Sequence, residues 1–164
     1  MSAQTRYGFT TPIGVAGGIY DLAPYEINTF LNEEETGVMS FGVGVVKGTA
    51  PGANVKLPAE GATAADFEGI TVNNRTTEYG LDDKVRVRKG ASMGVMRYGR
   101  IYGRVAADVE PEYGEAVYMV ASGEEAGFFT NVASGNVAIK ARFGGSVDPI
   151  HKVALIELFN QAQA

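Results

Sequence analysis

The sequence predicts an all-β fold: a single domain of roughly nine or ten short antiparallel strands, arranged as a sandwich or a barrel, with an extended N-terminal arm. Short runs alternate between apolar residues and polar residues or glycine, and no segment keeps a helical period over roughly ten residues. Glycine supplies 22 of the 164 residues without a three-residue repeat, which indicates frequent turns. Alternation does not reveal strand order, so sandwich and barrel both remain open.

The N-terminal arm is expected over residues 1–17, and the β-rich domain over residues 18–164. Aromatic residues of the arm, Tyr7 and Phe9, stand among Thr, Gly and Pro without a clean period. Such a terminus is ordered only where it lies on another surface.

The first strand is expected over residues 25–31, where Tyr25, Ile27 and Leu31 share a face. A helix is the rival interpretation, because Asp21 could cap it and the three glutamates at 33–35 would prolong it. The β-branched residues favour the strand, and the glutamates then form a solvated turn.

The next region contains two expected strands separated by a loop. Residues 39–45 alternate Met, Phe and Val with Ser and Gly, which predicts a strand, and residues 67–72 predict a short one. Residues 48–65 contain two prolines and few apolar side chains, so a long exposed loop is expected there. Residues 73–83 are polar and typical of turns.

The stretch from residue 84 to residue 106 predicts a hairpin of two half-buried strands. In its second run Val95, Ile101 and Val105 fall on the expected core face. The opposite face carries a row of tyrosine and arginine: Tyr98, Arg100, Tyr102 and Arg104. Seven of the chain's 14 basic residues lie in the stretch, and no acidic residue does.

The C-terminal part predicts further strands. Residues 116–121 and 127–132 flank a five-residue loop and predict a hairpin. Residues 137–143 alternate and predict a strand. Residues 152–159 are apolar enough to form a central strand, and the tail after residue 159 is expected to fray.

The sequence offers almost no catalytic chemistry, so an enzyme is not expected. It has no cysteine and one histidine, His151, which leaves a single possible Ser–His arrangement. Ser146 lies in Gly-Gly-Ser-Val-Asp, which lacks the second glycine of a nucleophile elbow. We therefore predict no catalytic residues and no cofactor.

The acidic connection at residues 108–115 raises the question of a metal ion. Oxygen ligands at Asp108, Glu110, Glu112 and Glu115 would suit calcium, but the EF-hand signature is absent. A solvated turn, or an acidic counterpart to the basic strands of a neighbouring subunit, is the favoured interpretation, and no metal site is predicted.

Three interpretations of the tyrosine–arginine row remain open. These residue types carry contact energy at protein interfaces, which is the favoured interpretation, with Arg97 beside the row. The row could instead be a solvated face, or it could bind single-stranded nucleic acid by stacking and phosphate pairing. The net charge of −5 makes nucleic acid the less favoured partner. A carbohydrate-binding sandwich is a further alternative.

No membrane segment or secretory signal is expected. No apolar run approaches the roughly 20 residues that span a bilayer. Residues 1–18 lack a basic region followed by an apolar one, so we expect the chain to remain inside the cell that makes it.

Several strand sequences resemble those of tailed-phage structural cement proteins. Residues 41–46 (Phe-Gly-Val-Gly-Val-Val), 67–72 (Phe-Glu-Gly-Ile-Thr-Val) and 95–102 (Val-Met-Arg-Tyr-Gly-Arg-Ile-Tyr) resemble successive strands of that family. The opening Gly-Ile-Tyr-Asp at 18–21, the hairpin at 116–131 and the last strand at 153–158 fit the same pattern.

The resemblance implies a decoration protein on the outside of the virion. Such proteins, typically as homotrimers, sit on the assembled head and bridge neighbouring copies of the major capsid protein, with synthesis in the host cytoplasm. From residue type and alternation we expect Arg97, Tyr98, Arg100, Tyr102 and Arg104 to make protein contacts, chiefly between subunits, and Tyr7 and Phe9 to grip the capsid.

Overall fold

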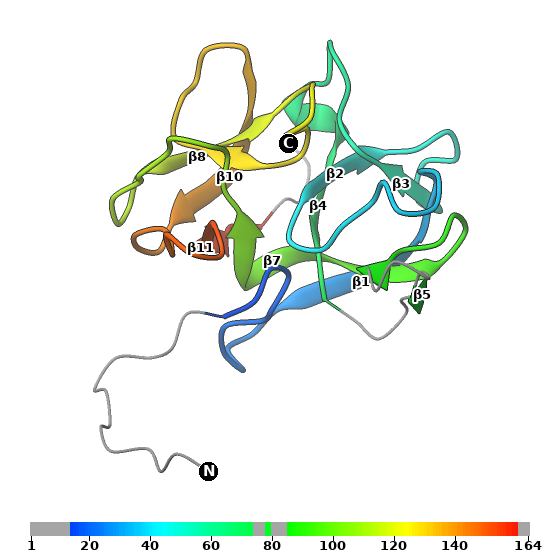
Figure 1. The fold of residues 1–164 in the computed structure, drawn as a ribbon, viewed down its shortest axis with the longest axis horizontal. Helices are drawn as coiled ribbons and strands as arrows, with labels where there is room; N and C mark the ends of the chain where they lie inside the picture. The colour runs from blue at the N-terminus through cyan, green and yellow to red at the C-terminus, as the bar shows by residue number, and fades with distance from the viewer. Residues whose placement is uncertain (1–13, 74–77, 80–84, 161–164) are drawn as a thin grey trace.

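The computed structural model describes residues 14–73, 78–79 and 85–160 (Figure 1). Within these ranges it contains eleven β-strands and one 3-10 turn at Ala64–Asp66. The predicted all-β class is therefore confirmed. No helix among the described residues is long and apolar enough to cross a membrane.

Five strands close into a barrel, which settles the choice between barrel and sandwich. They pair in the order β1-β3-β2-β4-β7, and β1 also pairs with β7 to complete the ring. All of these pairs are antiparallel except β1 with β3, which is parallel. The strands are β1 (Glu26–Asn32), β2 (Gly44–Lys47), β3 (Asn54–Lys56), β4 (Phe67–Thr71) and the first half of β7 (Ser92–Arg104).

The second half of β7 belongs to another antiparallel sheet, with strand order β7-β11-β10-β8-β9. The additional strands are β8 (Ala116–Val120), β9 (Phe129–Thr130), β10 (Asn136–Phe143) and β11 (Val153–Leu158). An isolated parallel bridge between Val105 and Phe129 brings β9 back to the end of β7. Figure 1 shows β8, β10 and β11 on one side, β1 to β4 on the other, and β7 running between them.

Each half of the molecule has its own apolar core. Inside the barrel, Phe30, Val45 and Met93 are buried with their neighbours. Between the barrel wall and the second sheet, Ile101 and Phe129 are buried in a second cluster. Burial of whole aliphatic and aromatic side chains at about 1.5–3 kcal/mol each makes these clusters the main source of stability.

Strand β7 serves both cores because its side chains change partners along its length. Val95 is buried in the barrel core and Ile101 in the second core, as alternation predicted for this face. Between them Gly99 adopts a φ of +123°, a conformation that favours glycine. A Cβ at this position would come within 2.7 Å of the Tyr25 side chain, so glycine also permits a close approach.

Most of the expected strands are found. β1 confirms the strand interpretation of residues 25–31 over the helix, and β4, β10 and β11 lie where they were predicted. β11 is central, between β7 and β10, and β8 pairs with β9 as the predicted hairpin. β2 is shorter than expected, because residues 39–43 precede it outside regular structure.

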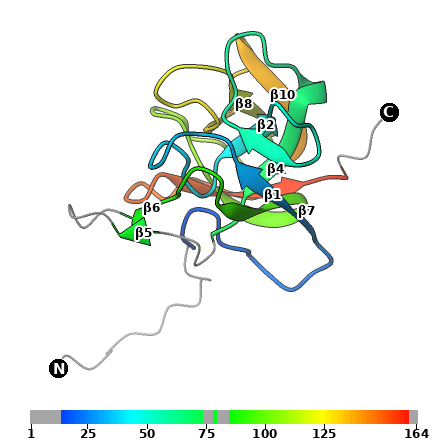
Figure 2. The ribbon, with the colours of Figure 1, turned by 90° about the vertical axis from the view of Figure 1, so that its right-hand side faces the viewer.

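Two predictions of local structure were wrong. The expected loop at 48–65 contains β3, a member of the barrel, and the 3-10 turn. The expected hairpin at 84–106 does not form, because β6 (Val85–Arg86) pairs with β5 (Glu78–Tyr79) and not with β7. Figure 2 shows β5 and β6 at one side of the body, apart from the second sheet.

Candidate interaction surface

The predicted tyrosine–arginine row lies on β7, but its members differ in exposure. Tyr98 is 40% exposed and Tyr102 only 7%. Arg100 and Arg104 are half-buried. All four residues therefore lie on the strand where alternation placed them. Part of the row is covered by another segment of the chain.

The covering element is residues 14–25, which we call the cover segment. Its backbone follows the edge of β7 opposite β11: Gly17 N–H donates to Tyr102 O at 2.7 Å, and Tyr20 N–H donates to Arg100 O at 3.0 Å. Tyr102 N–H in turn donates to Gly18 O at 3.0 Å. An antiparallel bridge between Ile19 and Ile101 completes this short extra pairing.

The ring of Tyr102 is enclosed by the cover segment. The backbone of Gly14 lies so close to this ring that a Cβ there would overlap it. Tyr20 meets it edge-on, and burial raises the pKa of the Tyr102 phenol. The predicted contact role of Tyr102 remains a prediction, but in the single chain its ring packs internally.

The arginines of the row are engaged within the chain as well. Arg100 Nη1 lies 3.0 Å from Asp21 Oδ2, and its Nε lies 3.8 Å from Glu157 on β11. Glu157 also binds Arg142 Nε at 2.7 Å. Arg100, Glu157 and Arg142 sit opposite one another across β7, β11 and β10, so opposite charges alternate across the sheet.

Two more arginines have different environments. Arg104 donates from Nε to Phe41 O at 3.0 Å, and desolvation lowers the pKa of its guanidinium. Arg97 Nη2 is 3.9 Å from the buried Glu68, and its own buried Nε has no hydrogen-bond partner within the described residues. Arg97 is thus held loosely by comparison with Arg100.

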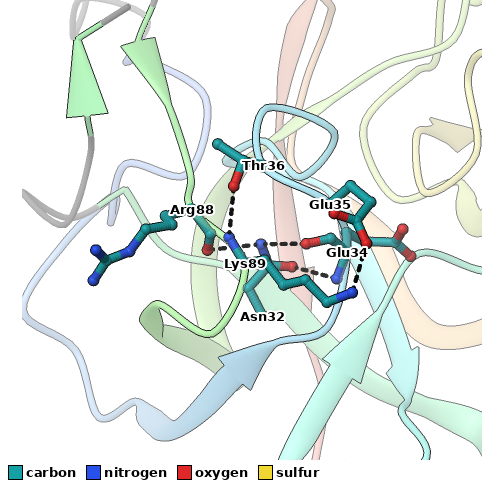
Figure 3. Close-up of polar contacts among 6 residues, drawn as sticks. All are labelled: Asn32, Glu34, Glu35, Thr36, Arg88 and Lys89. Carbon is teal, nitrogen blue, oxygen red and sulfur yellow. Dashed lines mark hydrogen bonds and ion pairs between the residues drawn. The ribbon is translucent and has the colours of Figure 1, made fainter.

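The basic turn before β7 is bound to the glutamates that follow β1 (Figure 3). Asn32, 1% exposed, donates through its amide to Arg88 O at 3.1 Å and accepts from Glu34 N–H at 3.0 Å. Lys89 Nζ binds Glu35 at 2.5 Å, and Lys89 N–H donates to Thr36 Oγ1.

The glutamates at 33–35 lead into an exposed turn at residues 36–38, and Glu35 is 75% exposed, but their carboxylates also bind other parts of the chain. Glu33 accepts from Thr49 N–H at 2.6 Å, and this bond holds the pKa of Glu33 below its usual value. Glu34 accepts from Leu57 N–H at 2.9 Å. Each carboxylate ties the end of β1 to a different neighbouring segment.

These contacts argue against a single-strand nucleic-acid groove along β7. Such a groove needs accessible rings for stacking and cations available to phosphates. Here the Tyr102 ring is buried, and Lys89 and Arg100 already bind carboxylates. The geometry supports contact with protein better.

The most exposed apolar side chains of this region lie on the cover segment. Leu22 is 93% exposed, Val15 62% and Tyr25 47%. From the sequence, Tyr25 was expected only on a strand face, and Leu22 was assigned no role. Pro24 was a signal that the chain changes direction here, and residues 22–24 form a bend. Tyr7 and Phe9 lie outside the described residues.

Within residues 14–73, 78–79 and 85–160, no three His, Asp or Glu side chains are placed to hold a metal ion. His151 Nδ1 lies 2.5 Å from Asp148 Oδ2, and Asp148 also accepts from Ile150 N–H, so this pair braces the turn before β11. Between Tyr20, Arg100, Tyr113 and Leu155 lies a shallow depression of about 170 Å³.

Comparison with known proteins identifies a family and solved structures that this chain resembles. A family model described as structural cement protein (E217 gp24/Pam3 gp6) matches residues 3–159. Among solved structures, a chain from the capsid of Myoviridae phage XM1 has the same fold, with a TM-score of 0.70 and 18% sequence identity over 96% of this chain and 98% of that one. No curated protein sequence matches.

Proposed function

Because the chain belongs to the family of phage structural cement proteins, its role is a structural one at the phage capsid, and we propose that it binds the outer surface of the assembled head as a trimer. There it bridges neighbouring copies of the major capsid protein. It is made in the host cytoplasm and joins the head after assembly. The family match over residues 3–159 carries the proposal.

The physical basis is multivalent adhesion. A typical stable interface buries about 1,600 Å² in total. A trimer that engages several capsid subunits makes its second and third contacts intramolecular, so modest contacts add up to tight retention. If it binds only the assembled lattice, it stabilises that state by mass action.

Within this proposal the predicted contact residues take different parts. Tyr98 is exposed and meets a partner directly, whereas Arg100 and Tyr102 hold the cover segment in place behind it. Arg97 and Arg104 lie on β7 before and after these three residues. Tyr7 and Phe9 are assigned to the capsid surface on their residue type alone.

The test is to mix the purified chain with undecorated heads and to pellet and image them by electron microscopy. We expect saturable density on the outer surface and heads that disassemble at a higher temperature than undecorated ones. A parallel titration with labelled single-stranded oligonucleotides should show no binding at physiological salt. Heads that stay bare at micromolar protein would rule the proposal out, and tight, salt-sensitive oligonucleotide binding would favour the nucleic-acid alternative.

A further inference from the structure

We infer that the outward face of the second sheet around Arg142 binds a protein segment that presents a carboxylate beside an apolar side chain. Arg142, Glu157, Tyr113 and Phe159 make up this face, here called the arginine surface. The inference rests on the proposed function, which makes the major capsid protein the source of the segment. None of these four residues was expected at a contact from the sequence.

Arg142 points away from the core because successive residues of β10 face opposite sides of the sheet. Its neighbours Ala141 and Phe143 are buried in the core between the barrel and the second sheet, whereas the Arg142 side chain is 38% exposed. Glu157 stands opposite it on β11 and accepts a hydrogen bond from Arg142 Nε at 2.7 Å. The guanidinium group is therefore fixed along its Nε edge.

Two aromatic rings lie against the guanidinium group of Arg142. Its Cζ atom is 5.5 Å from the ring centroid of Tyr113 and 5.7 Å from that of Phe159, within the range of cation–π attraction. The two aromatic residues remain 69% and 41% exposed, so the fold of the single chain leaves much of their surface in water. Tyrosine, phenylalanine and arginine are enriched at protein interfaces, and an arginine already held in place loses little conformational entropy when a partner binds.

The hydrogen bonds that Arg142 leaves unmade select a carboxylate. Within the described part of the chain it donates only through Nε, so the N–H groups of its two Nη atoms remain for a partner. A carboxylate accepts two parallel hydrogen bonds from one guanidinium group, which makes it the matching acceptor. Glu157 is already shared, because its Oε1 lies 3.8 Å from Arg100 Nε.

The chain's own acidic connection at residues 108–115 does not supply that carboxylate. Glu115 accepts from Asn131 Nδ2 and from Glu112 N–H, both at 3.0 Å. Among the described residues, the one acidic side chain that pairs with Arg142 is Glu157. The additional acceptor therefore comes from another molecule.

The depression beside Arg142 takes the apolar part of the segment. Tyr113 and Glu157 line it and also contact Arg142, so the two features adjoin. Its lining also includes Tyr20 and Leu155, and its volume of about 170 Å³ leaves room for one side chain. An apolar group there would exclude water from the neighbouring carboxylate–arginine pair, which strengthens that pair.

The charges around Arg142 favour a protein over a nucleic acid. A phosphate backbone is bound by several cations that are available to successive phosphates. Here Arg100 binds Asp21 at 3.0 Å, and both arginines share Glu157, so further phosphates would meet these two carboxylates. A single acidic side chain with an apolar neighbour brings less of that repulsion.

The first experiment pellets undecorated heads with the full chain, with Arg142→Gln and with a matched control, Lys56→Gln. Both variants lose one positive charge, but Lys56 lies on β3 in the barrel. For Arg142→Gln we expect the apparent dissociation constant to rise at least about 10-fold, because a capsid carboxylate would be left without its partner. Lys56→Gln should stay within about two-fold of wild type. Arg142→Lys keeps the charge but lacks the planar fork, so it should bind more weakly than wild type.

Tyr113→Ala tests the same surface without a change of charge. Because the residue is 69% exposed, its removal should leave the fold intact, and we expect about 10-fold weaker binding to heads. Circular dichroism checks that each variant is folded, and sedimentation velocity checks that it keeps the oligomeric state of wild type.

The second experiment does not use heads. The Arg142 Nε–H resonance is followed by nuclear magnetic resonance while a blocked peptide, acetyl-Gly-Leu-Glu-Leu-Gly-amide, is titrated into the full chain. The same peptide with Gln in place of Glu is the control. We expect a saturable shift with the Glu peptide at millimolar concentration, a much smaller one with the Gln peptide, and no shift of the neighbouring backbone amides in Arg142→Gln.

If wild type binds heads, the pelleting experiment decides the inference. Arg142→Gln and Tyr113→Ala that bind heads as tightly as Lys56→Gln overturn it and leave the proposed function in place. An oligomer that dissociates only with Arg142→Gln also overturns it, because the arginine surface would then join copies of this chain.

If wild type never binds heads, the proposed function fails and the peptide titration decides the carboxylate site. A shift specific to the Glu peptide upholds the site, and equal responses to the two peptides overturn it. A larger response to a single-stranded oligonucleotide than to the Glu peptide would overturn it in favour of nucleic acid.

Discussion

The ring of Tyr20 meets the ring of Tyr102 edge-on, with centroids 5.9 Å apart and ring planes at 67°. Edge-to-face pairs of this kind are favourable beyond the area that they bury. The contact joins the cover segment to the centre of β7. It also explains why a tyrosine that alternates with arginine on an outward face is among the buried residues.

Tyr102→Ala is expected to destabilise the fold by about 3 kcal/mol, because it removes a buried ring and leaves a cavity beneath the cover segment. Tyr98→Ala, on the same strand but exposed, should cost less than about 1 kcal/mol. Urea unfolding of both variants measures the difference. Equal losses would mean that the cover segment does not enclose Tyr102 in solution.

Gly17→Ala should disrupt the cover segment more than Gly52→Ala disturbs its loop. Both glycines have positive φ, +76° and +82°. A Cβ at Gly17 would lie 2.6 Å from Asn73 N and 2.9 Å from Thr71 O, whereas nothing lies within 4 Å at Gly52. We expect losses of about 3 kcal/mol and about 1 kcal/mol in thermal unfolding. A Gly17→Ala variant no less stable than Gly52→Ala would contradict the close packing.

Asn32→Ala is expected to cost about 2 kcal/mol, because it leaves Arg88 O and Glu34 N–H without their side-chain partner in a buried setting. Asn28→Ala, half-buried on the same strand, is the control and should cost less. Hydrogen exchange should speed up at residues 34–37 and 88–91 in the Asn32 variant only. Unchanged exchange there would show that the amide does not hold the two segments together.

Acid should weaken the turn before β11 through Asp148. Hydrogen bonds from the His151 ring and from Ile150 N–H hold the pKa of Asp148 below its ordinary value of 3.8. A carboxyl with a lowered folded pKa stabilises the fold fully above the unfolded pKa, and this stabilisation is lost as pH falls through the folded pKa. Asp148→Asn should therefore be less stable than wild type at pH 7, with a smaller fall in stability between about pH 4 and pH 2. If the stability of wild type and that of Asp148→Asn changed with pH in parallel, Asp148 would not stabilise this turn.

β7 and β10 were predicted from alternation and β11 from its apolar content, whereas the alternation over residues 39–45 gave a strand only from Gly44 onward. β3 was missed because three residues, Asn54–Lys56, are too few to show a period, and the surrounding glycine and proline indicate a loop. β6 was expected to pair with β7 because adjacent strands joined by a glycine turn usually pair, whereas here β6 pairs with β5. The choice of partner depends on contacts distant in the chain.

On the candidate surface, too, local features were predicted from the sequence and features that depend on distant contacts were not. Alternation identified the outward residues of β7, including Tyr98 and Arg100, since strand geometry is local. It could not show that residues 14–25 fold back over Tyr102, because nothing in the pattern of β7 encodes what lies above it. The exposed residues Leu22 and Tyr25 became visible only once that segment was placed.

The position of β7 in both the barrel and the second sheet has a consequence for how the molecule bears load. Neither half retains a complete set of neighbours if this strand is withdrawn, so we expect the two halves to unfold together. A force applied to either half is transmitted to the other half through the continuous backbone of β7. Mechanical work done on one side of the molecule is therefore resisted by both cores at once.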